Sequence, residues 1–109
     1  MHSPNMRYGF VYQSDNNLVL YDLKSGKALW AGNTCCAKPG KAGLLQDGTM
    51  SVTDKTNNKQ WTEVGNAHPG PVGAFLVVDN QGSVKICNGD NNMVKLSINK
   101  AGKIIRHDN

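Results

Sequence analysis

Short runs in which apolar and polar residues alternate recur along the whole chain, and residues that favour turns bound each run. Alternation with a period of two predicts half-buried strands, and no window shows the 3.6-residue period of an amphipathic helix. The runs span Tyr8–Gln13, Leu18–Tyr21, Lys27–Trp30, Ala42–Leu45, Met50–Thr53, Gln60–Thr62, Ala74–Val78, Ser83–Cys87 and Val94–Ile98. Between them lie clusters such as Ser14–Asn17 and Asp79–Gly82, whose residues tolerate positive φ and close hairpins. We therefore expect an all-β protein built from antiparallel hairpins.

Three of these hairpins resemble one another in sequence. The similar segments are Phe10–Asp22, Ala42–Asp54 and Leu76–Asn88, and a strand that carries Trp30 or Trp61 follows each of the first two. A single hairpin cannot bury an apolar face alone, so three similar units are expected to pack around a common axis with both tryptophans in the core. The repeat predicts a three-sided β-prism of three antiparallel sheets with pseudo-threefold symmetry.

The length of 109 residues suits one domain with one modest core. We expect a single domain over residues 1–109, with the core repeats at about 8–98 and a C-terminal extension at 99–109. Within the extension, Lys103–Arg106 has the composition of a further strand. An unpaired sheet edge invites pairing, so this strand is expected to pair within its own chain or to exchange with a neighbour in a homo-oligomer, most simply a dimer.

The charge of the chain adds little to this picture. Twelve basic and eight acidic residues give a net charge of +4, but most lysines stand singly, which is typical of an ordinary solvated surface. No apolar run approaches the roughly 20 residues of a membrane-spanning helix, and Met1–Asn5 lacks the features of a signal peptide. These features predict no membrane insertion and a protein that is cytoplasmic or unconventionally secreted.

The three cysteines leave more than one arrangement open. Because adjacent cysteines rarely bridge each other, any internal disulfide would join Cys35 or Cys36 to Cys87 and leave one thiol free. Reduced, structural cysteines are the favoured alternative. No CxxC pair occurs and no histidine lies at zinc-site spacing from the cysteines, so we expect no metal site.

The first repeat carries the most informative set of side chains. Gln13, Asp15, Asn17, Val19 and Tyr21 stand two residues apart, so they emerge on one face while the leucines between them point into the core. Sugar hydroxyls are both donors and acceptors, and an amide, a carboxylate and a phenol around a small apolar group complement them. The carboxylate is expected to form the strongest single bond.

This segment resembles the monocot bulb lectins, the snowdrop-type mannose-binding family, whose motif is Gln-x-Asp-x-Asn-x-Val-x-Tyr. Every specified position of the motif is present from Gln13 to Tyr21. Leu29–Thr34 is also similar to the recurrent Ile-Trp-Ala-x-Asn-Thr of the family. The resemblance implies a β-prism II fold, and a lectin that binds terminal mannose or mannose-containing glycans without a metal ion or other cofactor.

The resemblance also implies a role for each residue of the motif. Asp15 and Asn17 would hold the axial 2-hydroxyl of mannose, Gln13 the 3-hydroxyl and Tyr21 the 4-hydroxyl, while Val19 would pack on the ring carbons. The axial 2-hydroxyl separates mannose from glucose, so Asp15 and Asn17 would set the specificity.

The other two repeats depart from the motif. Its positions are Leu45, Asp47, Thr49, Ser51 and Thr53 in the second repeat, and Asp79, Gln81, Ser83, Lys85 and Cys87 in the third. We therefore expect one working site per chain, with weak binding of a single sugar.

Two other functions remain as alternatives. A degenerate β-prism could serve as a protein-interaction module, and a basic surface that includes Lys100, Lys103 and Arg106 could bind anionic glycans or nucleic acid, nucleic acid being the less favoured of these partners. An enzyme is disfavoured, because the three histidines lie apart from one another and from any nucleophile motif. They are His2, His68 and His107.

Overall fold

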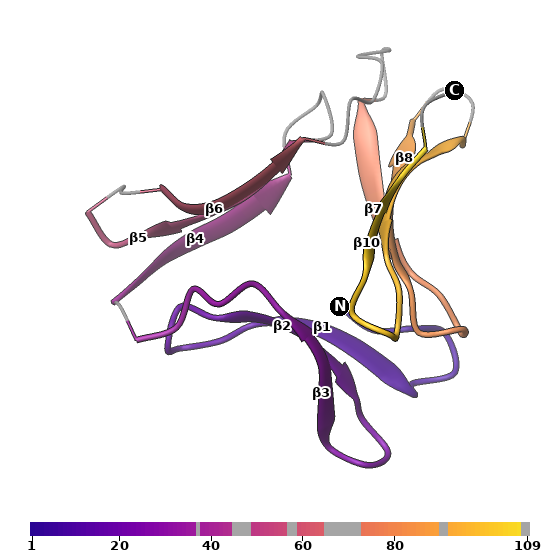
Figure 1. Cartoon of the computed structure of the whole chain (residues 1–109), viewed down its shortest axis with the longest axis horizontal. Coiled ribbons are helices and arrows are strands. Elements are labelled where there is room, and N and C mark those ends of the chain that lie inside the picture. Colours follow the sequence, from indigo (N-terminus) through magenta and orange to yellow (C-terminus); the bar gives the residue numbers. More distant parts are fainter. Residues whose placement is uncertain (37, 45–48, 57–58, 65–72, 90–91, 108–109) are drawn as a thin grey trace.

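The computed structural model describes residues 1–36, 38–44, 49–56, 59–64, 73–89 and 92–107 (Figure 1). For residues 59–64 only the course of the backbone is described. The predictions for Leu45, Asp47 and His68, and for the side chain of Trp61, therefore fall outside the described residues.

The described residues form ten strands and no helix. The strands are β1 (Tyr8–Tyr12), β2 (Leu18–Asp22), β3 (Lys27–Ala31), β4 (Pro39–Leu44), β5 (Thr49–Asp54), β6 (Lys59–Val64), β7 (Ala74–Val78), β8 (Val84–Asn88), β9 (Val94–Ile98) and β10 (Ile104–Arg106). The all-β prediction is confirmed, and the expected runs match the observed strands to within a few residues.

The strands form three antiparallel sheets, one from each sequence repeat. Their orders are β1-β2-β3, β4-β5-β6 and β10-β9-β8-β7. Figure 1 shows the sheets as the three sides of a prism, with β10 added to the third side. This is the three-sided arrangement that the sequence repeat predicted.

The pseudo-threefold symmetry extends to irregularities of the sheets. In each sheet the register between the second and third strand of the repeat shifts once, at the same place in the repeat. The shifts lie between Leu20 and Tyr21, between Val52 and Thr53, and between Ile86 and Cys87. Because a bulge increases the local twist of a strand, each sheet bends at the same point as it wraps the common axis.

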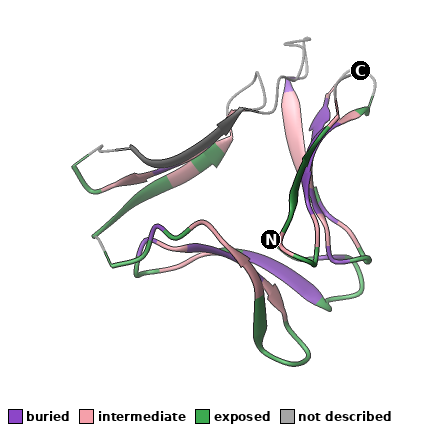
Figure 2. Ribbon diagram, viewed as in Figure 1, coloured by how far each residue is buried: buried purple, intermediate pink, exposed green. Residues whose placement is uncertain are grey.

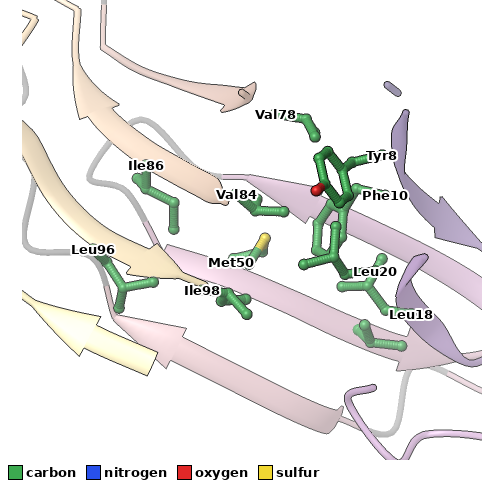
Figure 3. Close-up of a cluster of buried hydrophobic side chains, with 11 residues drawn as sticks. Tyr8, Phe10, Leu18, Leu20, Met50, Val78, Val84, Ile86, Leu96 and Ile98 are labelled. Atoms are coloured by element: carbon green, nitrogen blue, oxygen red, sulfur yellow. The ribbon is translucent and has the colours of Figure 1, made fainter. Parts of the chain in front are cut away.

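The core lies where the inner faces of the sheets meet. The middle strands contribute Leu20, Val52 and Ile86, each with 0% of its surface exposed. Figure 2 shows buried segments mainly in the first and third sheets, and Figure 3 shows the buried side chains gathered in one cluster. Trp30 is half-buried, packs against this cluster and lies 6.2 Å from Phe10 between ring centroids, so its predicted place in the core is confirmed.

The two ends of the chain each line an edge of a sheet. At the N-terminus, Met1 and Ser3 exchange backbone hydrogen bonds with Phe10 and Tyr8 of β1. At the C-terminus, β10 pairs with β9 of the same chain, with Ile104 opposite Ile98. The predicted strand in the C-terminal extension is confirmed, in the arrangement that stays within one chain.

One tight turn of the third repeat gives a direct test of this fold. Gly82 has φ +85°, and an added Cβ would lie 2.9 Å from Cε1 of the buried Tyr8 ring. We expect Gly82→Ala to destabilise the protein by about 1–3 kcal/mol, through backbone strain and steric overlap. The matched control is Gly43→Ala, because nothing lies within 4 Å of that position. Urea denaturation measures both variants, and equal stabilities would contradict the described packing of Tyr8 on this turn.

Candidate functional site

The candidate site is built on the hairpin that joins β1 to β2. Its turn is closed by the N–H of Gln13, which donates to the carbonyl of Asn17 at 2.8 Å, and by the N–H of Asn16, which donates to the carbonyl of Gln13 at 3.0 Å. Asn16 has φ +74°, a conformation that Asn adopts more readily than most residues. Gln13 thus opens the turn, Asp15 lies within it and Asn17 closes it. Val19 and Tyr21 follow on β2.

The five motif residues are arranged as their spacing predicts. Leu18 and Leu20 point into the core, so the residues between and beside them emerge on the opposite face of β2. Asp15 is exposed, and the other polar residues of the motif are half-buried. Val19 is only 2% exposed and lies at the base of this face. Its side chain therefore leaves almost no apolar surface exposed on this face.

Asp15 supplies an acceptor at the rim of the site. Its Oδ1 accepts a hydrogen bond of 2.9 Å from the N–H of Asn17, which leaves Oδ2 directed to other donors. Within the described residues, no Lys or Arg forms an ion pair with this carboxylate. No ion pair among the described residues therefore occupies the acceptor oxygens of Asp15.

Asn17 supplies a donor next to this acceptor. Its Oδ1 accepts hydrogen bonds from the backbone N–H of Thr34 at 3.2 Å and from Oγ1 of Thr34 at 3.4 Å. A backbone N–H can only donate, so it identifies the facing amide atom as oxygen. The Nδ2 group of Asn17 consequently points its two N–H bonds away from Thr34.

Gln13 and Tyr21 complete the polar set. Nε2 of Gln13 donates to the hydroxyl oxygen of Tyr21 across the hairpin. This bond leaves the Gln13 carbonyl as an acceptor and the Tyr21 O–H as a donor. All four polar side chains of the motif thus carry unused hydrogen-bonding capacity on one face.

Thr34 and Asn16 support the site from behind, and the sequence analysis gave neither of them a role in it. Asn16 is fully buried and Thr34 is 1% exposed. Nδ2 of Asn16 donates to the carbonyl of Thr34 at 3.0 Å, and Oγ1 of Thr34 donates to the carbonyl of Asn16 at 2.6 Å. The hydroxyl of Tyr12 also donates to Oδ1 of Asn16. The signal in the sequence for Thr34 was its place at the end of the segment Leu29–Thr34, and Asn16 had no such signal.

The disulfide in the structure differs from both arrangements that the sequence predicted. Cys35 and Cys36 are joined to each other in a vicinal disulfide, whereas Cys87 is a free, buried thiol. Neither the expected bridge to Cys87 nor the fully reduced alternative is present. Cys87 lies on β8 in the core of the third sheet, and the tight turn after β3 brings only Cys35 and Cys36 together. The N–H of Cys36 donates to the carbonyl of Asp15 at 2.7 Å, so this turn touches the candidate site.

The third repeat forms the same backbone turn but carries different side chains at the motif positions. Asp79 occupies the place of Gln13, and its N–H donates to the carbonyl of Ser83 at 2.9 Å as that of Gln13 does to Asn17. Lys85, in the place of Val19, forms an ion pair of 2.8 Å with Asp79. Burial raises the pKa of Asp79, but hydrogen bonds from Lys85, Ser83 and Gln81 outweigh burial and hold that pKa below its usual value. The long cation and its partner carboxylate thus occupy the face on which the first repeat presents a small Val.

The second repeat is described only in part. Thr49, Ser51 and Thr53 lie on β5, and none of them supplies the carboxylate or amide of the first repeat. Thr53 donates from Oγ1 to the carbonyl of Lys41 at 3.3 Å. Only hydroxyl side chains are therefore present at the described motif positions of this sheet.

Metal-ligating clusters are absent from the part of the chain that the structure describes, where no three His, Cys, Asp or Glu side chains come together. Those residues also form no helix that is long and apolar enough to span a membrane.

Removal of the Thr34 hydroxyl tests the support behind the site. Thr34→Val keeps the shape of the side chain but leaves the buried carbonyl of Asn16 without its 2.6 Å donor. We expect a loss of about 1–3 kcal/mol in the free energy of unfolding, measured by urea denaturation. Thr34→Ser retains the hydroxyl and is the control. A Val variant as stable as the Ser variant would contradict the described network.

The Asp79–Lys85 ion pair predicts a pH-dependent stability. Because the pKa of Asp79 in the folded protein lies below its ordinary value of 3.8, its carboxylate stabilises the fold above that pH, and this stabilisation is lost as the pH falls through the folded pKa. We expect Asp79→Asn to destabilise the protein at about pH 7, and the difference from the native sequence to shrink toward about pH 2. Thermal unfolding across this range measures the effect. A difference that is independent of pH would contradict the assigned pair.

Comparison with known proteins agrees with this description. The chain is 39% identical over 72 residues to a mannose-specific lectin of Aloe arborescens, a match that covers 65% of this chain and 62% of that lectin. No protein-family model matches the chain.

Two solved structures share the fold. A monomeric monocot mannose-binding lectin from Gastrodia elata has a TM-score of 0.71 at 26% identity, over 84% of this chain and 78% of that chain. The Marasmius oreades lectin has a TM-score of 0.70 at 20% identity, over 93% and 80% of the two chains, and supports the fold alone. The fold is therefore a β-prism II. The chain is thus similar in sequence to a mannose-specific lectin and in architecture to a monocot mannose-binding lectin, which agrees with the resemblance carried by the motif from Gln13 to Tyr21.

Proposed function

We propose that this chain is a single lectin domain that binds terminal mannose through one site in the first repeat, with Gln13, Asp15, Asn17, Val19 and Tyr21 as its residues. The observation that carries the proposal is the orientation of Asn17. Thr34 engages its Oδ1, which leaves Nδ2 as a donor on the residue whose backbone N–H binds the Asp15 carboxylate.

This pair suits a sugar hydroxyl. Such a group can donate its hydrogen to the Asp15 carboxylate while its oxygen accepts from Nδ2 of Asn17. An axial 2-hydroxyl meets both partners, whereas an epimer with an equatorial hydroxyl leaves them unpaired, and unpaired polar groups in a binding site are costly. Gln13 and Tyr21 offer one acceptor and one donor for further hydroxyls.

Recognition of this kind requires neither a metal ion nor a reaction. All the proposed contacts come from side chains of the hairpin, and the Aloe arborescens relative is named for mannose specificity. The chain spans 62% of the length of that relative, and the lectin name of that relative supports a binding function rather than an enzymatic one.

One site per chain implies weak binding. The Asp79–Lys85 ion pair occupies the third repeat, and a single small sugar buries few atoms, so we expect a Kd of roughly millimolar order. Useful avidity would then come from an oligomer. The outer edge of β10 has no neighbouring strand in the described sheet, and we propose this edge as the contact of a dimer.

A titration with methyl α-mannoside and methyl α-glucoside, followed by NMR chemical shifts, tests the proposal. We expect shifts confined to the first-repeat hairpin and stronger for the mannoside. Asn17→Ala should weaken mannoside binding by at least about tenfold, because it removes a donor to a sugar hydroxyl and leaves the backbone N–H of Thr34 without its acceptor. The matched control is Ser83→Ala, which changes the equivalent position of the third repeat and should leave the affinity unchanged.

Three results would contradict the proposal. A saturating mannoside that shifts no resonance would exclude the site. Equal effects of Asn17→Ala and Ser83→Ala on the affinity would show that binding does not depend on the first repeat in particular. Binding that responds only to anionic glycans, and falls steeply with added salt, would favour the basic surface instead.

A further inference from the structure

The vicinal disulfide lies at the border of the proposed mannose site. Cys35 and Cys36 follow Thr34 directly, and both are exposed to solvent. The N–H of Cys36 donates to the carbonyl of Asp15 at 2.7 Å. The disulfide is thus one hydrogen bond away from the backbone of the residue that supplies the carboxylate of the site.

The segment that contains the disulfide clamps the turn of the site. Thr34 bonds the backbone of Asn16 and the side chain of Asn17, and Cys36 bonds the backbone of Asp15. Three consecutive residues of the turn are therefore held by the segment from Thr34 to Cys36. The position of the Asp15 carboxylate relative to the Asn17 amide depends on this clamp.

The disulfide restrains the clamp in an uncommon backbone conformation. Cys36 has φ +79°, a left-handed conformation that is unfavourable for a residue with a Cβ. The chain beyond it is anchored, because the carbonyl of Lys38 accepts a 2.9 Å hydrogen bond from the N–H of Lys55 and β4 begins at Pro39. With the far end fixed, a relaxation of Cys36 would turn the peptide that bears its N–H and break the bond to Asp15.

We propose that the Cys35–Cys36 disulfide holds the mannose site in its binding form, and that reduction of this bond weakens sugar binding. The inference rests on the proposed function of the first repeat. In the reductive step a dithiol gives two electrons and two protons, the sulfur–sulfur bond breaks, both cysteines become thiols and the reductant closes to a cyclic disulfide. The fold needs no rearrangement beyond the turn from Thr34 to Cys36.

The third cysteine does not take part in this exchange. Cys87 is only 5% exposed, on the third sheet. Burial raises its pKa, and the nearby Lys85 offsets only part of that rise. Because the thiolate is the attacking species in disulfide exchange, a buried thiol with a raised pKa is a poor nucleophile.

Alkylation followed by mass spectrometry establishes the bond itself. The chain has three cysteines, of which one is free, so the native protein denatured without reductant should take up one alkyl group and the reduced protein three. Uptake of three groups without reductant would show that the disulfide does not form, and this result would overturn the inference.

Mannoside titration of the oxidised and reduced protein tests the effect on binding. We expect the Kd for methyl α-mannoside to rise about fivefold on reduction with dithiothreitol, as the loss of one backbone hydrogen bond implies. The amide resonances of Asp15 and Cys36 should move, while those of the third sheet stay. Cys35→Ser with Cys36→Ser should bind as weakly as the reduced protein and ignore the reductant. Cys87→Ala is the control and should keep both the affinity and its response.

The outcomes separate the two proposals. If the oxidised protein does not bind mannoside, the proposed function fails. If it binds but reduction leaves the Kd unchanged, the function stands and the role of the disulfide is wrong. Circular dichroism checks the folding of the double serine variant, and reduction of the native sequence gives the same comparison without any substitution.

Discussion

Each of the three sheets has one apolar face, and these faces leave water only by packing against one another. Leu20, Val52 and Ile86 lie at the centre of this contact with no exposed surface, and burial of each such side chain contributes about 1.5–3 kcal/mol. Because side chains alternate along a strand, a leucine fixed inward fixes its neighbours outward. The polar face that carries Asn17 and Tyr21 is therefore a consequence of the shared core.

The outward face becomes a binding site only where a second layer of contacts orients it. In the first repeat, the buried pair of Asn16 and Thr34 fixes the turn and selects which end of the Asn17 amide meets solvent. In the third repeat the same backbone turn carries Lys85 and Asp79, which satisfy each other. The first and third repeats thus share a backbone turn, and their side chains decide how its outer face differs.

The sequence predicted the strands, the threefold repeat and the face of the motif, because all three follow from a period of two and a shared need for burial. It did not predict the roles of Asn16 and Thr34. Their hydrogen bonds join residues far apart in the chain, and Asn16 is indistinguishable from an ordinary turn former until the fold is known. It also missed the bond between Cys35 and Cys36, since adjacent cysteines rarely pair and only the local course of the backbone at a positive φ brings this pair together.

The central claim is that the first repeat alone binds mannose, through the paired acceptor and donor of Asp15 and Asn17. A crystal structure of the chain with methyl α-mannoside tests it most directly. We expect one sugar per chain, with its 2-hydroxyl within hydrogen-bond distance of the Asp15 carboxylate and of Nδ2 of Asn17, and no sugar on the third sheet. A sugar bound on another face, or on the first hairpin without contact to these two side chains, would contradict it.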